Sequence, residues 1–372
     1  MRFLHTADLH LGITLGGFSL LQAQEEMLEQ IIALVHAESV DGVLISGDVF
    51  DRAVSGADAI ALYDRFLTTL CADCHVPVFI IAGNHDGGAR LEQLRGLLAP
   101  AGLHLAGRLT ARPEPIDVGD AQVFLIPYFH IEQVRLLYPE QKIETMEAAM
   151  ACLMDDVRAR RAPDKPTVVV AHCFVTGASA AESDIAAQLG GAQQIGAQVF
   201  AGVSYVALGH LHRAQTPAPG VHYAGSPYPY AFSEGENGVS IYDTATGRLA
   251  RHTFHPSITL RTLRGPYDTI LAAAQTDPHN LDYMKIELTD RGAGLDALDT
   301  LRACYPHLVT LIGTQTDSAQ PDALTVAEVQ AMSPRALLCR FCEEVGGYTP
   351  QEDEIQSFLR AMDIIQEGGG LQ

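Results

Sequence analysis

Five short polar clusters in this chain each follow directly on an apolar run. The runs are short enough to be strands, and the residues after them are acids, amides and histidines. In a parallel sheet the carboxyl ends of neighbouring strands meet at one edge, so these clusters are expected to line one crevice. The clusters are Asp8-Leu9-His10, Gly47-Asp48, Gly83-Asn84-His85-Asp86, Ala171-His172 and Gly209-His210-Leu211-His212.

Strand-like and helix-like stretches alternate along the first part of the chain. They read as strands at 2–7, 43–46 and 78–82, with helical spacing between them at 28–35 and 63–70. This βαβαβ order predicts an α/β fold with a parallel sheet. Further strands are predicted at 122–127, 167–171, 205–208, around 222, at 239–242 and at 249–254. Because the last of these follow one another closely, they predict a second sheet with antiparallel pairs.

The chain is predicted to divide into three parts. A boundary near His255-Pro256 would close a first domain at 1–256, and residues 257–314 have the pattern of a compact β-α-β-α-β unit. Residues 315–372 begin with a polar linker and end in two helices, which Ser333-Pro334 and a capping box at 349–352 would open. The apolar stripes of these helices fit packing on their own domain or binding of a partner, and both readings remain open.

Composition sets limits on location and on nucleic-acid binding. No apolar stretch reaches the roughly 18 residues of a membrane span, and the start lacks the apolar run of a signal peptide, so a cytoplasmic protein without a membrane partner is expected. Lys and Arg number 24 against 45 Asp and Glu, a formal charge of −21, which argues against binding nucleic acid through overall charge alone. The seven cysteines are expected to be reduced thiols.

The clusters have the donor types of a binuclear metal site. Oxygen and imidazole donors without thiolate suit Mn²⁺, Fe²⁺ or Zn²⁺. Two metals roughly 3.5–4 Å apart need a carboxylate that bridges them, and Asp48 is the predicted bridge. The other predicted ligands are Asp8, His10 and His212 for one metal and Asn84, His172 and His210 for the other.

His85 is predicted to stay off the metals. It lies next to Asn84, where its imidazole would be free to contact a scissile phosphate and to protonate the leaving oxygen. Asp86 is the candidate to orient that imidazole. His85 and Asp86 are therefore the predicted catalytic residues.

Each motif has a competing structural explanation. A single Asp-x-His is more often a turn or a cap, and it is the combination of five clusters in this order that favours a metal site. His5 fits a core position better than a supporting role at the site. Arg52 and Arg90 would hold a phosphate backbone or form ion pairs with nearby acids such as Asp51, and neither reading is favoured.

The same residues resemble the calcineurin-like metallophosphoesterases. Longer runs narrow the resemblance to the SbcD family, the nuclease subunits of bacterial SbcCD complexes, which are related to double-strand-break repair nucleases of archaea and eukaryotes. Those runs are His5-Thr6-Ala7-Asp8-Leu9-His10-Leu11-Gly12, Asp48-Val49-Phe50-Asp51-Arg52-Ala53, the run from Tyr205 to His212, and Gly225-Ser226-Pro227. The resemblance is strong over the first 255 residues. Beyond them it rests on the order of the predicted strands and helices more than on sequence motifs.

The resemblance implies a fold, a cofactor and partners. It implies a four-layer αββα sandwich with a small α/β capping domain and C-terminal helices, and a centre of two Mn²⁺ ions. It also implies ATP-dependent 3′–5′ exonuclease action on double-stranded DNA and endonuclease action on single strands and hairpins, in DNA repair and recombination. The implied partners are DNA, an SMC-like ATPase of the SbcC type docked on the final helices, and a second nuclease chain within a heterotetramer.

Two other functions use the same motifs or the same fold. A small-molecule phosphatase or cyclic-nucleotide phosphodiesterase would need the five clusters but not the additional domain and terminal helices. A scaffold without activity would be expected to have lost ligands, whereas all seven ligand positions and His85 are intact. The sequence therefore favours a nuclease.

Overall fold

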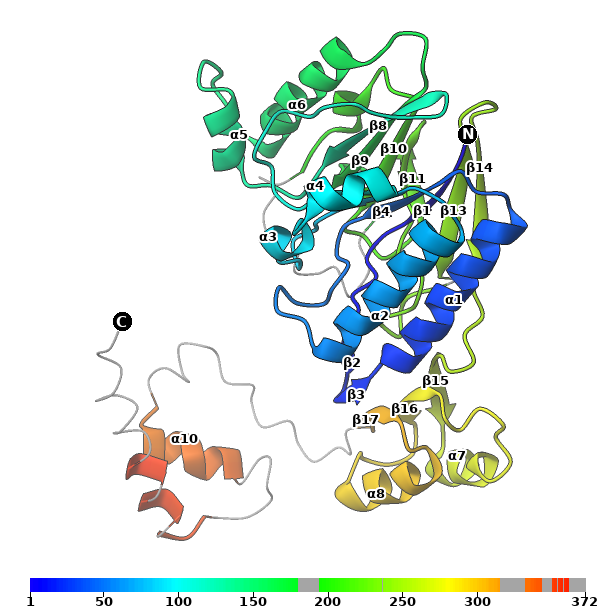
Figure 1. Cartoon of the computed structure of the whole chain (residues 1–372). Helices are drawn as coiled ribbons and strands as arrows, with labels where there is room; N and C mark the ends of the chain where they lie inside the picture. The colour runs from blue at the N-terminus through cyan, green and yellow to red at the C-terminus, as the bar shows by residue number, and fades with distance from the viewer. Residues whose placement is uncertain are drawn as a thin grey trace. The chain divides into compact units, whose positions relative to one another are not determined.

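The computed structural model describes residues 1–179, 194–235, 237–314, 332–342 and 350–360, without 353 and 357. By their contacts these residues form two compact units, Met1–Gly313 and Thr314–Gln372. Figure 1 shows the course of the chain from the blue amino terminus to the red carboxyl-terminal helices. The division at 256 and 257 inside the first unit stays a prediction.

The first unit contains two six-stranded sheets. In the first sheet the order is β14-β13-β1-β4-β5-β6. Its parallel strands are β1 (Arg2–Thr6), β4 (Gly42–Ser46), β5 (Val78–Ile81) and β6 (Leu103–Ala106). Its antiparallel edge is made by β13 (Gly238–Asp243) and β14 (Arg248–Thr253).

The second sheet has the order β11-β12-β10-β9-β8-β7. Its parallel strands are β8 (Ala121–Ile126), β9 (Thr167–His172), β10 (Tyr205–Gly209) and β12 (Val221–Tyr223), and its antiparallel edges are β7 (Ile116–Val118) and β11 (Gln215–Ala218). The expectation that all the later strands join one second sheet is wrong for β13 and β14. They pair with each other as expected, but they extend the first sheet.

The central strands are mostly apolar because both faces of each sheet are buried. In β4, Val43 and Ile45 face one core while Leu44 faces another, as the alternation of side chains along a strand requires. The cluster around Leu44 lies between the two sheets, where it meets Val168 and Val170 of β9. The core around Val43 is shared with helices on the outside of the first sheet.

Helices cover the outer face of each sheet. On the first sheet lie α1 (Leu21–Ala37) and α2 (Ala57–Thr68), and on the second lie α5 (Ile131–Leu137) and α6 (Met146–Arg160). In α1 the buried residues Met27, Leu28, Ile31 and Val35 recur at helical spacing, and each such side chain contributes about 1.5–3 kcal/mol by burial. The expected four-layer αββα sandwich is confirmed (Figure 1).

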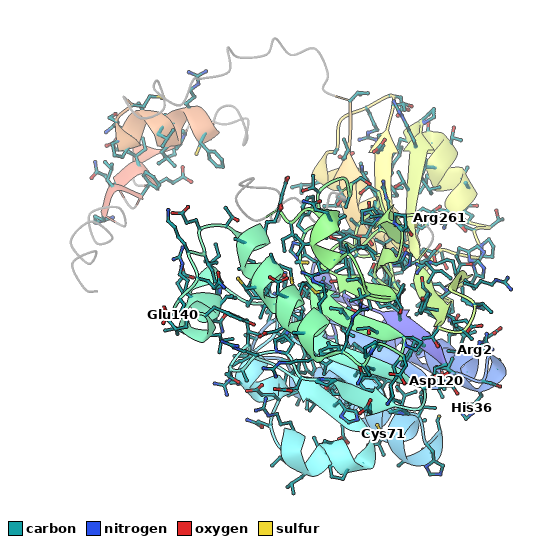
Figure 2. All side chains as sticks on the ribbon, turned by 90° about the horizontal axis from the view of Figure 1, so that it is seen from above. Arg2, His36, Cys71, Asp120, Glu140 and Arg261 are labelled. Carbon is teal, nitrogen blue, oxygen red and sulfur yellow. The ribbon has the colours of Figure 1, made fainter. Side chains whose placement is uncertain are left out.

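A small three-stranded parallel sheet completes the first unit. Strands β15 (Leu260–Gly265), β16 (Tyr283–Leu288) and β17 (Leu308–Ile312) alternate with α7 (Tyr267–Ala274) and α8 (Leu295–Cys304) and have a hydrophobic core of their own. Within it Arg261, labelled in Figure 2, pairs through Nη2 with Asp277 Oδ2 at 2.6 Å. The Tyr283 hydroxyl donates to the Ser19 carbonyl at 2.8 Å and so ties this sheet to the hairpin of β2 (Thr14–Leu15) and β3 (Phe18–Ser19).

The second unit contains α10 (Pro334–Phe341). The hydroxyl of Ser333 accepts from the Ala336 amide at 3.2 Å, so the predicted start of this helix is confirmed. Leu337 and Phe341 on its apolar stripe are 40% and 60% exposed. Thr349, the first residue of the predicted capping box, lies outside the described residues. Among the described helices of both units, none has the length and apolar character needed to cross a membrane.

Candidate metal centre

The seven predicted ligands lie at the carboxyl ends of strands from both sheets. Four follow strands of the first sheet, at β1, β4 and β5, and three come from β9 and β10 of the second. The two sheets therefore bring together residues that are up to about two hundred positions apart in sequence. From the first sheet come Asp8, His10, Asp48 and Asn84, and from the second His172, His210 and His212.

The first predicted ligand set forms one cluster of donor atoms. Asp8, His10 and His212 each present an atom within 4.8 Å of the others. Nε2 of His10 lies 3.2 Å from Nε2 of His212. His10 Nδ1 is buried and has no hydrogen-bond partner among the described residues, which is costly for a polar atom unless a ligand completes the site. This donor set fits a divalent metal ion.

The second predicted set meets at the side-chain oxygen of Asn84. Asn84 Oδ1 lies 2.9 Å from Nε2 of His172 and 3.0 Å from Nδ1 of His210. One amide oxygen and two imidazole nitrogens thus converge on one point. These are ligand types that transition metals accept.

Asp48 lies between the two sets. Its Oδ2 is 3.3 Å from His172 Nε2 and 3.9 Å from His10 Nε2. Asp8, Asp48 and His172 also form a cluster of donors within 4.8 Å. A carboxylate that reaches both sets in this way has the placement that a bridging ligand needs.

Hydrogen bonds outside the donor clusters orient two of the imidazoles. His172 Nδ1 donates to the Ser46 carbonyl at 2.8 Å, which leaves Nε2 as the coordinating nitrogen. His212 Nδ1 lies 3.1 Å from Oε1 of Glu234, a side chain only 2% exposed. Sequence reasoning missed Glu234, because it lies in the loop between β12 and β13 and does not directly follow an apolar strand.

His85 is exposed and lies beside the first set of donors. Its ring centroid is 4.8 Å from that of His10, and its Nδ1 donates to the Asp51 carbonyl at 3.0 Å. The backbone amide of His85 donates to Asp48 Oδ1 at 2.8 Å, which fixes the loop against the predicted bridge. His10, Asp51 and His85 form a further donor cluster, so Asp51 is an acid near the site that was not predicted as a site residue.

Asp86, the residue expected to orient the His85 imidazole, has backbone amides as its hydrogen-bond partners in this structure. Its carboxylate accepts from the backbone amides of Gly83, Val49 and Phe50 at 2.9–3.1 Å. Asp86 therefore ties the loop after β5 to the loop after β4, while the Asp51 carbonyl takes the contact with the His85 imidazole.

Three other candidates have ordinary structural contacts. His5 is fully buried between Tyr205 Oη at 2.9 Å and Ser46 Oγ at 3.0 Å, so it is a core residue. Arg52 pairs with Asp51 at 3.1 Å, the ion pair considered above. Arg90 donates to the Ala53 carbonyl at 3.3 Å.

Burial and neighbouring charges set the protonation of the donors before a metal binds. Burial lowers the pKa of His10 and of His210 to about 3, so both imidazoles are neutral and able to coordinate at pH 7. For His172 burial acts in the same direction, but the Asp48 carboxylate outweighs it and raises the pKa to about 9. Burial would raise the pKa of Asp48, yet the neighbouring His172 holds it below its ordinary value. Asp48 therefore stays ionised.

The chain belongs to the calcineurin-like phosphoesterase family, whose family model matches residues 1–214. Family membership and the donor clusters together indicate a phosphoester hydrolase that binds divalent metal ions. A second family model, described as the type 5 capsule protein repressor C-terminal domain, matches residues 256–346.

Two curated relatives are both named as the SbcD component of the nuclease SbcCD. The protein from Staphylococcus epidermidis is 27% identical, with 86% of this chain and 87% of the relative covered. The one from Staphylococcus saprophyticus is 24% identical, with 99% of this chain and 100% of the relative covered. The resemblance to the SbcD family is thereby confirmed. Among solved structures, TT1561 of Thermus thermophilus has a TM-score of 0.41 and 16% identity, with 68% of this chain and 98% of that chain covered.

Proposed function

We propose that this chain is the metal-dependent nuclease subunit of a complex with an SMC-like ATPase of the SbcC type. The observation that carries the proposal is the position of Asp48 between two sets of donors, at the edge where the two sheets meet. Support also comes from relatives named as nuclease subunits, which match this chain over most of its length. We assign Asp8, His10 and His212 to one metal, Asn84, His172 and His210 to the other, and Asp48 to both.

The reaction that fits this site is hydrolysis of a phosphodiester. Two bound divalent cations, which we propose to be Mn²⁺, would lower the pKa of water and offset charge on the phosphoryl group. Neutral His10 and His210 donate lone pairs without losing a proton first, and ionised Asp48 supplies negative charge between the two sets. His85 stands beside this cluster, exposed to an incoming strand, and protonates the departing sugar oxygen.

The kinds of DNA cleavage that we propose are those implied by the resemblance to the SbcD family. We propose 3′–5′ exonuclease action on double-stranded DNA and endonuclease action on single strands and hairpins, in cytoplasmic DNA repair and recombination. The helices after residue 332 would dock on the ATPase, and the exposed Leu337 and Phe341 of α10 provide apolar surface for that contact.

We also propose a homodimer of the nuclease subunit, for which the first unit offers exposed apolar residues. Among them are Ile60 on α2 and Leu94 and Leu97 beside or within the short helix α4 (Arg95–Leu98), which are 50%, 67% and 76% exposed. Changing Leu97 to Glu would place a charge in such an interface and is expected to give monomers in sedimentation equilibrium. A wild-type chain that is monomeric at micromolar concentration would contradict the dimer.

The alternative is a small-molecule phosphodiesterase of the same family. The experiment that separates the two compares linear duplex DNA with a phosphodiester dye, in Mn²⁺, with and without the ATPase. We expect cleavage of DNA that the ATPase and ATP increase. If only the dye is cleaved even with the ATPase present, the chain is a small-molecule enzyme.

A further inference from the structure

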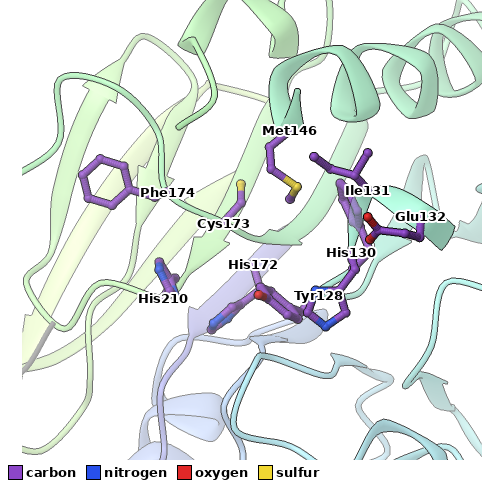
Figure 3. A pocket seen from close by; sticks show the side chains of 10 residues that line it. Tyr128, His130, Ile131, Glu132, Met146, His172, Cys173, Phe174 and His210 are labelled. Carbon is purple, nitrogen blue, oxygen red and sulfur yellow. The ribbon is translucent and has the colours of Figure 1, made fainter. Parts of the chain in front are cut away.

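A pocket of about 230 Å³ adjoins the metal centre and has no part in the chemistry described so far. Its walls come from the segment after β8, from the start of α6, from the end of β9 and from the residue after β10. Figure 3 shows Phe174 across the pocket from Tyr128 and His130, with His172 and His210 along one side. Two predicted metal ligands therefore form part of its wall.

Contacts of Tyr128 fix the aromatic side of the pocket relative to the predicted metal ligands. The ring centroid of Tyr128 lies 6.3 Å from that of His172 and 5.4 Å from that of His130, and both pairs are nearly perpendicular. The backbone amide of Tyr128 donates at 2.9 Å to the carbonyl of Ala82, two residues before Asn84. The pocket thus stays at a fixed distance from the second set of donors.

The lining indicates what kind of group fits. Besides the rings, it consists of the apolar side chains Ile131, Met146 and Cys173 and one acid, Glu132. The described residues that line it include no lysine or arginine, so an anionic phosphate would find no permanently charged partner here. A neutral, flat ring would find aromatic side chains for stacking and apolar contacts.

We infer that this pocket receives the base of a nucleotide next to the scissile phosphodiester, turned out of its stack. The inference rests on the proposed function, because it takes DNA as the substrate. His172 and His210 belong both to the second donor set and to the pocket wall, so a phosphate held at that set would place a neighbouring nucleoside beside the pocket. Bringing a phosphate of a duplex end to a recessed site requires unstacking, and stacking on Tyr128 offsets part of that cost.

The test is a double-mutant cycle in which one change is made in the protein, Tyr128→Ala, and the other is removal of one base from the substrate. Wild-type protein and Tyr128→Ala are each assayed, with Mn²⁺, on a single-stranded oligonucleotide whose cleaved bond has been mapped. The substrates carry either a base or an abasic residue at the nucleotide on each side of that bond. We expect Tyr128→Ala and one of the abasic positions each to lower kcat/KM about tenfold, and the two losses together to be no larger than either one. Losses that multiply, or no loss in Tyr128→Ala, would overturn the inference.

Three controls make the result specific. Tyr128→Phe keeps the ring and should keep most of the activity, so an equal loss in both variants would overturn a stacking role. Tyr267→Ala removes a half-buried tyrosine of α7, away from the pocket, and should cleave DNA at the wild-type rate. Manganese content and thermal melting identify a variant that has lost its fold. If wild-type protein cleaves the phosphodiester dye but none of the oligonucleotides, it is the proposed function that fails, and the inference fails with it.

Discussion

Glu234 positions a predicted metal ligand from outside the motifs. Its Oε1 accepts from His212 Nδ1, and its Oε2 accepts from the Tyr230 amide at 2.9 Å. The carboxylate therefore fixes both the ring orientation and the tautomer of His212, which leaves Nε2 to face His10.

We predict that Glu234→Gln weakens metal binding by about 10- to 100-fold while the fold is kept. The amide is nearly the same size as the carboxylate but removes its negative charge and makes it a poorer acceptor for His212. Titration of the metal-free protein with Mn²⁺ measures the affinity. The matched control is Glu140→Gln, an exposed acid labelled in Figure 2, which should bind manganese like wild type. Equal affinity in the two variants would show that Glu234 has no such role.

At this scale the sequence was sufficient to predict which proposed ligands lie together, but not which residues hydrogen-bond to them. The proposed ligands follow apolar strands directly, so sheet geometry alone is sufficient to gather them. The hydrogen bonds that Asp86 accepts depend on how the loops after β4 and β5 pack against each other. The contact of Glu234 with His212 joins residues that are 22 positions apart in the sequence. No local pattern encodes such contacts.

The connections between strands and ligands adopt uncommon backbone conformations. Asp8, His10, Asp48 and His210 have positive φ angles of 53°, 41°, 48° and 101°. Such conformations are unfavourable for residues with a Cβ and persist where the surroundings impose them. Here the apolar strands, buried on both faces, hold the turns that follow them.

Gly83, after β5, shows how little space these turns leave. A Cβ at this position would collide with Oδ1 and the backbone nitrogen of Asp48. We predict that Gly83→Ala displaces the Asp48 carboxylate and lowers both manganese content and activity at least tenfold. Gly96→Ala, in the short helix α4, adds a methyl group where no described atom lies within 4 Å and should leave both unchanged. Full manganese content in Gly83→Ala, measured by elemental analysis, would contradict this account of the turn.

Most strand positions in the two large sheets were predictable, but β6, β7 and β11 were not predicted, and neither was the sheet that each strand joins. Continuous apolar runs such as those of β4 and β9 have a length and pattern typical of buried strands, and the predicted limits agree within one or two residues. The placement of β13 depends on pairing with β1, where Leu4 opposes Ile241 across more than two hundred residues. Closeness in sequence favoured the other sheet and was misleading.

The whole molecule carries a formal charge of −21, which two divalent cations would reduce only to roughly −17. Overall charge therefore repels DNA even when the site is loaded. Binding must come from local contacts at the metals, from the aromatic pocket and from the proposed ATPase partner.

We predict that the isolated chain binds duplex DNA only weakly at physiological salt and that the ATPase supplies most of the affinity. Fluorescence anisotropy with a labelled duplex measures both states. The chain alone should have a Kd above the micromolar range, and the complex a much lower one. Submicromolar binding by the metal-free chain alone would show that some local surface overcomes the charge.

In the site that we propose, seven side chains hold two metals through a bridging Asp48, while His85 acts on the substrate without holding a metal. In Asp48→Ala the bridge is gone, so most of the metal should be lost and DNA cleavage with it. This variant provides the reference values of metal content and cleavage rate for a protein that has lost its metal site.

The most direct test is the manganese content of His85→Ala, measured together with its rate of DNA cleavage. We expect two manganese ions per chain, as in wild type, and a rate lower by about 10²- to 10⁴-fold, as for loss of a general acid. Loss of manganese would make His85 a ligand, and wild-type cleavage would remove it from the mechanism. Either result would contradict the division of roles proposed for this site.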